Sequence, residues 1–139
     1  MQIDTTTDYG KRVERRLREE TIIWLTTVRR DGTPQPAPVW FLWDGETVLM
    51  YSRPNQQKQR NIERSPKVSL HLDGDGRGGN IIVLTGEARI VTDAPPATAV
   101  PTYIAKYAEP IARIGMTPES FAAAYSVAIR ITPTDVRGH

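Results

Sequence analysis

The sequence predicts a mainly β domain of the α+β class, a six-stranded antiparallel barrel that is closed or partly open and carries a few short helices. Two Asp-Gly dipeptides, at positions 31–32 and 44–45, each lie between apolar runs of strand length, and Asp-Gly is the strongest short signal of a β-hairpin. The run 126–131 alternates apolar residues on one face. Strands and helices do not follow each other in a βαβ rhythm, so a parallel sheet is not expected.

The first half of the chain is expected to begin with a helix at about Tyr9–Glu20, with Val13 and Leu17 as a narrow apolar stripe. This helix would lie across the end of the barrel as a lid. Three strands are then expected, at about Thr21–Arg29, Gln35–Trp43 and Thr47–Ser52. If each Asp-Gly is a two-residue turn, both of its residues need positive φ, and the strands form an antiparallel meander that ends at Ser52.

The second half is expected to alternate short helices with three more strands. A glycine-rich loop at 74–79 is expected to separate two of these strands and to allow close backbone approach to a ligand. Thr117 is expected to be an N-cap with Pro118 at the first helical position. In order, the elements are helix Gln56–Arg64, ended by Pro66, strands Lys67–Asp73 and Asn80–Thr92, helical segments Pro95–Tyr107 and Thr117–Tyr125, and strand Ser126–Ile131.

Length and composition predict one domain over residues 1–139, with the barrel at about 21–131. The chain has no cysteine and two histidines, His71 and His139, so a transition-metal site is not expected. Its 18 basic and 16 acidic residues leave a net charge of +2, too even a balance to indicate nucleic-acid binding. No apolar run approaches the roughly 20 residues of a membrane span, and the polar N-terminus is unlike a signal peptide, so the expected location is the cytoplasm.

The segment 50–62 has the local chemistry of a phosphate site. A strand leads into Ser52, then a turn, then a helix whose first turn contains Lys58. The start of a helix has free backbone N–H groups and the positive end of the helix dipole, and Lys58 adds a full charge. Lys58, Arg60 and Arg64 could equally form the solvated face of an amphipathic helix, and Asn61 could brace the turn instead of touching a ligand.

No catalytic constellation is recognisable in the sequence. The chain lacks a cysteine nucleophile and a nucleophile-elbow serine, and its glycine-rich loop lacks the spacing of a dinucleotide fingerprint. His71 lies midway along an expected strand and is interpreted as structural. Trp40 and Trp43 are three residues apart on one expected strand, so they should face opposite sides and at most one can line a given pocket.

The order of short motifs resembles a known family. Asp-Gly-x-Pro-Gln is followed by Pro-Val-Trp-Phe, by a strand ending in Ser52, by Lys58-x-x-Asn-Ile and by Ser-Pro-Lys-Val-Ser-Leu. This set resembles the pyridoxamine-phosphate-oxidase-like proteins, whose fold is the FMN-binding type of split β-barrel, over about Thr21 to Ile131. It is most similar to the group that uses the deazaflavin coenzyme F420.

The resemblance implies a homodimer with two cofactor sites at the interface, whose assembly would also cover the apolar surface that the strands are expected to expose. Strands and the following helix of one protomer would hold the cofactor, and the glycine-rich loop region of the partner would cover its ring. The residues carried over as cofactor-binding are Pro38, Val39, Met50, Tyr51, Ser52, Gln57, Lys58, Gly79, Asn80 and Ile81. Gln57 and Lys58 would hold the phosphate. Relatives often have a basic residue where this chain has Gln56, so Arg53 or Arg77 is expected to meet the acidic tail.

The function that the resemblance implies is an F420H2-dependent oxidoreductase, in which the reduced deazaflavin passes a hydride to an electron-poor small molecule. The cofactor would do the chemistry, and the protein would orient it and exclude water. Two alternatives remain: an FMN- or tetrapyrrole-binding split-barrel protein, or a non-catalytic cofactor-binding or stress protein. The fewer arginines around the expected phosphate argue against oxidation of pyridoxamine phosphate itself.

Overall fold

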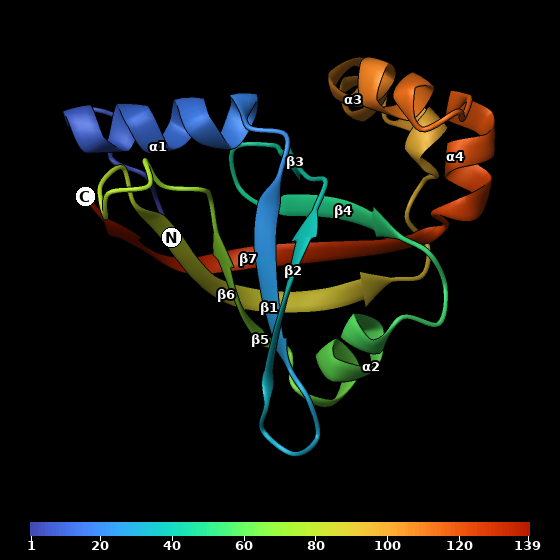
Figure 1. The fold of residues 1–139 in the computed structure, drawn as a ribbon, viewed down its shortest axis with the longest axis horizontal. Coiled ribbons are helices and arrows are strands. Elements are labelled where there is room, and N and C mark those ends of the chain that lie inside the picture. The colour runs from blue at the N-terminus through green and yellow to red at the C-terminus, as the bar shows by residue number, and fades with distance from the viewer.

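A computed structural model describes residues 1–139 as one curved seven-stranded antiparallel sheet, a half-barrel with four α-helices around it (Figure 1). The strands are β1 Ile23–Val28, β2 Pro34–Val39, β3 Leu42–Trp43, β4 Val48–Ser52, β5 Lys67–His71, β6 Ile82–Val91 and β7 Val127–Gly138. The helices are α1 Asp8–Glu19, α2 Gln57–Arg64, α3 Pro101–Arg113 and α4 Pro118–Ala124, with a 3-10 turn at Ala97–Ala99. The antiparallel β class is confirmed, and the prediction of six strands is wrong by one.

The additional strand arises because the expected strand Gln35–Trp43 is interrupted at Trp40 and Phe41. The Phe41 N–H donates to the Tyr107 hydroxyl at 2.8 Å instead of to a neighbouring strand. The Phe41 carbonyl accepts from the Tyr107 hydroxyl at 2.9 Å and from Lys106 Nζ at 2.8 Å. Side chains of α3 therefore make the hydrogen bonds that the Phe41 backbone would otherwise make to a neighbouring strand. The local sequence does not reveal this contact.

The predicted meander is also wrong. The sheet order is β2-β1-β5-β6-β7-β4-β3, so β2 and the β3–β4 hairpin lie at opposite edges. The chain crosses from one edge to the other through the interruption at Trp40 and Phe41. β4 pairs with β7, with Ser52 opposite Val127. This pairing brings Ser52 next to the chain that leaves α4.

Both hairpins form at the Asp-Gly dipeptides, but their turns are not the expected two-residue type. Gly32 and Gly45 have φ of 89° and 96°, while the preceding aspartates are outside the positive-φ region. Asp31 and Asp44 instead accept backbone N–H groups two or three residues later. The aspartates therefore act as side-chain acceptors in longer turns.

β7 runs seven residues beyond the expected end at Ile131 because it pairs with β6 along its whole length, as far as Ile82 opposite Gly138. Pro133 does not end the strand, because the β6–β7 register shifts between Thr85 and Gly86. A Cβ on Gly86 would lie 2.7 Å from the Thr132 carbonyl oxygen, so the two strands approach too closely for a side chain there.

Helix α1 lies across one end of the sheet, as predicted (Figure 1). Val13 and Leu17 are buried in the main hydrophobic cluster, together with residues of β1, β5, β6 and β7. Arg16 also points inward from α1 and donates to the Asn80 carbonyl at 2.8 Å and to the Asp73 carbonyl. The helix thereby fixes both ends of the glycine-rich loop.

Helices α3 and α4 lie beyond the C-terminal end of β4 (Figure 1) and contribute to a second hydrophobic cluster with Leu49 and Tyr51 of that strand. The α4 prediction is confirmed: Thr117 and Ser120 form a capping box and Pro118 is the first helical residue. The predicted helical segment Pro95–Tyr107 is displaced, because α3 starts at Pro101 and runs past Pro110. It ends in a Schellman motif in which Gly115 has φ 79° and Met116 donates to the Ile111 carbonyl.

The apolar surface expected on the strands is largely covered by α3 and α4. Met1 and Ile114 are the large hydrophobic side chains that remain exposed. Excess apolar surface is therefore not an argument for a dimer in this chain. None of the helices is long and apolar enough to cross a lipid bilayer.

Candidate cofactor pocket

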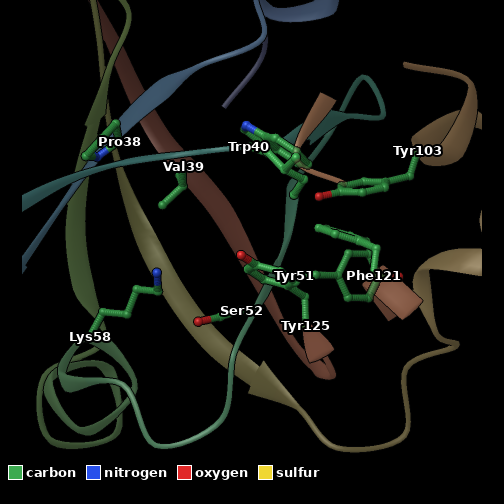
Figure 2. A pocket seen from close by; sticks show the side chains of 10 residues that line it. Pro38, Val39, Trp40, Tyr51, Ser52, Lys58, Tyr103, Phe121 and Tyr125 are labelled. Atoms are coloured by element: carbon green, nitrogen blue, oxygen red, sulfur yellow. The ribbon is translucent and has the colours of Figure 1, made fainter. Parts of the chain in front are cut away.

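A pocket of about 270 Å³ lies between α2, the end of β4 and the α3–α4 pair (Figure 2). Its lining is mostly apolar and aromatic, with one cation. This composition is typical of sites that hold a flat organic group by contact and orient it through a few polar atoms. The lining residues are Pro38, Val39, Trp40, Tyr51, Ser52, Lys58, Tyr103, Ile114, Phe121 and Tyr125.

Lys58 supplies the positive charge of the pocket. It is the second residue of α2, and Figure 2 shows its side chain extending toward Val39 and Ser52. Burial lowers the pKa of Lys58, and no carboxylate pairs with it. A partly buried ammonium without a counter-ion is costly, and an anionic ligand would relieve that cost.

The start of α2 adds unpaired donors beside Lys58. Gln56 is the N-cap residue and makes no side-chain hydrogen bond to the helix, so the first amides remain free for an anion. Ser52 is buried at the end of β4, but its hydroxyl already donates to the Arg53 carbonyl and accepts from Gln59 Nε2, both at 3.2 Å. Ser52 can therefore donate to a ligand only by giving up its present bond.

Asn61 fixes α2 against the sheet. Its side chain is fully buried and donates to Thr27 Oγ1 on β1 and to Gln35 Oε1 on β2, both at 2.9 Å. It also accepts from Gln57 Nε2 at 2.9 Å and from Arg64 at 3.3 Å. The structure therefore supports the interpretation that Asn61 braces the polypeptide by hydrogen bonding and does not touch a ligand. By holding α2 against the sheet, Asn61 also positions Lys58.

Five of the ten residues expected at the site line this pocket together: Pro38, Val39, Tyr51, Ser52 and Lys58. Met50 does not, because its side chain is buried in the main cluster on the other face of β4. Gln57 lies on the outer side of α2, in a hollow with Arg30, Arg60, Glu63 and Arg64. Its Oε1 accepts from Arg60 at 2.8 Å, and Arg60 is exposed, as expected for a residue on the solvated face of the helix.

Gly79, Asn80 and Ile81 lie beneath α1, at the opposite end of the sheet from the pocket (Figure 1). Gly79 donates to Asp75 at 3.0 Å, and Ile81 exchanges backbone hydrogen bonds with His139. Asn80 has φ 57°, and its side-chain oxygen is buried without a hydrogen-bond partner. Within one chain these three residues do not reach the pocket.

The aromatic wall of the pocket was not anticipated from the sequence. Trp40 stacks on Tyr107 and Phe121, with ring centroids 4.8 and 5.5 Å apart. Tyr103 and Tyr107 are four residues apart on α3, as are Phe121 and Tyr125 at α4. This i, i+4 spacing of aromatic residues indicates a buried helix face, but only the fold shows that β4 and Trp40 lie opposite it. Trp43 is buried in the main cluster, so the prediction that the two tryptophans face opposite sides is confirmed.

Arg53 is the second cation near the pocket. Its guanidinium lies 4.7 Å from the centre of the Tyr125 ring, a cation–π geometry. Arg53 is exposed, and it follows Ser52 directly. Arg77, the other basic residue considered for the acidic tail, lies in the glycine-rich loop. Of the two, only Arg53 lies beside the pocket of the same chain.

The start of α2 can bind an anion, and it lies beside a pocket lined by aromatic rings. A site of this kind is suited to a cofactor that has a phosphate group and a planar ring. The chain matches the family described as pyridoxamine 5'-phosphate oxidase over residues 10–139 and belongs to that family. No curated protein matches it.

Solved structures agree on the fold. A protein named F420 reductase is 30% identical, with a TM-score of 0.71 over 89% of this chain and 94% of its own. A conserved hypothetical protein of Mycobacterium tuberculosis is 22% identical, with a TM-score of 0.68 over 91% of this chain and 81% of its own. HutZ, the heme storage protein of Vibrio cholerae, is 16% identical, with a TM-score of 0.64 over 99% of this chain and 95% of its own. The last two share the fold alone.

Proposed function

We propose that the chain binds coenzyme F420 and acts as an F420H2-dependent oxidoreductase on an electron-poor small molecule. The observation that carries this proposal is Lys58, a partly buried cation without an acidic partner, placed at the start of α2 beside an apolar, aromatic pocket. The 30% identity to a protein named F420 reductase supports the choice of deazaflavin over other ring cofactors.

Different residues of one chain contact different parts of the cofactor. Lys58 and the first amides of α2 bind the phosphate, and Pro38 and Val39 border the ring. Tyr51 and Ser52 line the strand end beneath it. Gln57 keeps the start of α2 in place through its bond to Asn61, rather than by contact with the phosphate.

Arg53 takes the role of the basic residue that is missing at Gln56. Its guanidinium is exposed next to Tyr125, where it can meet the carboxylates of the cofactor tail as they leave the pocket. Reduced F420 supplies the hydride when it is bound. The protein would orient the ring and exclude water with its aromatic wall.

A haem protein is the less favoured alternative. Within one chain no histidine lines the pocket: His71 stacks on Trp24 at 6.1 Å, and His139 lies against the Gly78 carbonyl. Imidazole is a common axial ligand of haem iron in proteins. FMN remains the closer alternative because its phosphate would suit Lys58 equally well.

F420 is expected to bind at least about tenfold more tightly than FMN, because its acidic tail adds contacts to Arg53 that FMN cannot make. Fluorescence titration of the purified protein with oxidised F420, FMN and haemin measures this difference directly. Equal affinities for F420 and FMN, or tighter binding of haemin, would contradict the cofactor assignment.

We also propose a homodimer that completes the site. A pocket of about 270 Å³ is small for a cofactor with ring, phosphate and tail, so one chain encloses only part of it. Gly79, Asn80 and Ile81 would cover the ring from the partner. Sedimentation at micromolar concentration is expected to give twice the mass of one chain. A monomer under these conditions would count against a shared site.

A further inference from the structure

A second cavity lies where the β3–β4 hairpin and β7 meet the start of α3. Its volume is about 200 Å³, and Tyr51 is the one residue that it shares with the cofactor pocket. The Tyr51 hydroxyl donates to the Pro95 carbonyl at 2.9 Å, which holds this shared ring in place. Apart from the Tyr51 ring, the apolar wall of the cavity is aliphatic and comes from Leu42, Leu49, Ala94, Pro95 and Val100.

Arg130 places a guanidinium in this wall with one edge unused. It lies on β7 opposite Leu49 of β4, and its side chain is 28% exposed. Its Nη1 donates to Thr47 Oγ1 at 2.7 Å and to Asp44 Oδ2 at 3.4 Å, while Nε and Nη2 have no acceptor in the chain. A guanidinium can hold both oxygens of a carboxylate through two such neighbouring N–H groups.

Asp44 does not take that place, because the β3–β4 turn already uses its oxygens. Its Oδ1 accepts from the backbone N–H groups of Glu46 and Thr47 at 2.8 and 2.7 Å. Its Oδ2 accepts from the Thr47 hydroxyl at 3.0 Å and is 3.4 Å from Arg130 Nη1, longer than an ordinary hydrogen bond to a charged group. Asp44 therefore fixes the turn, and Arg130 keeps free donors for a ligand.

Two further features favour a negative group beside Arg130. Arg89 is directly opposite Arg130 in the β6–β7 ladder and forms no ion pair. Like charges in opposite positions destabilise a sheet, and an anion between them relieves that repulsion. The start of α3 also faces the cavity: Thr102 lines it, and the N-cap residue Val100 makes no side-chain hydrogen bond to the helix. Its first N–H groups and the positive end of the helix dipole therefore add to the attraction.

We propose that this cavity is a second binding site, for a small aliphatic monocarboxylate that pairs with Arg130 and inserts its hydrocarbon tail between Leu49 and Val100. The aliphatic wall favours a saturated chain over a planar ring, and a bare inorganic anion would leave that wall in contact with water. The volume is below the roughly 300–1,000 Å³ of pockets for drug-sized ligands, so the tail is short. The proposal does not depend on the identity of the cofactor, because Lys58 and the start of α2 are not part of this cavity.

The test titrates hexanoate, 1-hexanol and inorganic phosphate into the full-length protein without cofactor and follows its amide NMR signals. Hexanoate should shift the amides of Leu49, Thr102 and Arg130, whereas 1-hexanol should bind more weakly and phosphate should not shift these amides. Arg130→Gln should weaken hexanoate binding by about tenfold or more and leave 1-hexanol binding unchanged. Arg137→Gln is the matched control, because it removes an exposed arginine from the same strand, and it should change the affinity by less than about twofold.

Ala94→Phe is the second variant, and it fills the cavity without removing the bonds of Arg130. It should abolish hexanoate binding and keep the amide spectrum of a folded protein, so the test holds even if Arg130→Gln, which loses the bond to Thr47, does not fold. Lys58→Ala should bind hexanoate like the parent protein. Parental affinity in Ala94→Phe, no binding by the parent protein at about 10 mM hexanoate, or equal shifts with phosphate would overturn the proposal. Loss of hexanoate binding in Lys58→Ala would also overturn it, because the carboxylate would then lie in the cofactor pocket.

Discussion

Lys58→Ala is expected to weaken the binding of F420 by roughly ten- to a hundredfold, the equivalent of one charge-assisted hydrogen bond of about 1.5–3 kcal/mol. The lysine is partly buried and unpaired, so in the free chain its charge has no other role. Because the phosphate contact is remote from the ring, turnover at saturating cofactor should be largely retained. Fluorescence titration and steady-state kinetics measure the two quantities.

Arg60→Ala is the matched control, because it removes a cation from the opposite side of α2. Arg60 is exposed and bonds to Gln57 and Asn55 within its own segment. Its removal should change the affinity for F420 by less than about twofold, within the range of ordinary surface substitutions. Equal effects of Lys58→Ala and Arg60→Ala would return both residues to the solvated face of an amphipathic helix.

The pH dependence of cofactor binding distinguishes the contribution of the Lys58 charge from that of the packing of its side chain. Burial lowers the pKa of Lys58, so the free protein loses this proton at a lower pH than an exposed lysine does. Binding of a phosphate favours the ammonium, so affinity should fall as the pH rises through the lowered pKa. The Lys58→Ala variant should lack this fall, and titrations between neutral and alkaline pH compare the two.

Asn61→Leu is expected to lower the free energy of unfolding by on the order of 3 kcal/mol. Leucine has a similar size, but it removes both donors through which α2 is tied to β1 and β2, and the oxygen that accepts from two side chains of α2 itself. Thr27 is 1% exposed and would be left with an unpaired hydroxyl. Urea unfolding measures the loss, with Arg60→Ala as a control expected within about 0.5 kcal/mol of the parent.

The same variant should also weaken F420 binding, because α2 positions Lys58. If the free energy of unfolding of Asn61→Leu equals that of the parent protein, Asn61 is not the residue that holds the helix. A variant that loses stability but keeps full affinity for F420 would show that the start of α2 does not need the sheet for its position.

Elements with local signals were predictable from the sequence. Thr117 and Pro118 define the start of α4, Pro66 follows the C-cap residue of α2, and Lys58 is in the first turn of α2. Each depends on residues within one turn of the chain, where capping and proline geometry act. Five of the expected site residues meet in one pocket because β2, β4 and α2 supply them at their ends.

Features that depend on distant residues were not predictable. The interruption at Phe41 requires the Tyr107 hydroxyl, which is 66 residues away in sequence. Met50 is directed into the core because α3 and α4 bury the other face of β4, which leaves both faces covered. Gln57 was expected at the phosphate, but a hydrogen bond to Asn61 directs its amide along the helix. The spacing of the aromatic residues in α3 and α4 indicates only that these helices have a buried face. It does not indicate that this face lines the pocket.

The central claim is that Lys58 binds the phosphate of the cofactor, and the most direct measurement is a cycle that removes each partner in turn. F420 and its deazaflavin ring-ribityl fragment, which lacks phosphate and tail, are titrated into the parent protein and into Lys58→Ala. The account predicts a ten- to a hundredfold loss of affinity for F420, about 1.5–3 kcal/mol, and no change for the fragment. Equal weakening of both ligands, or of neither, would contradict it.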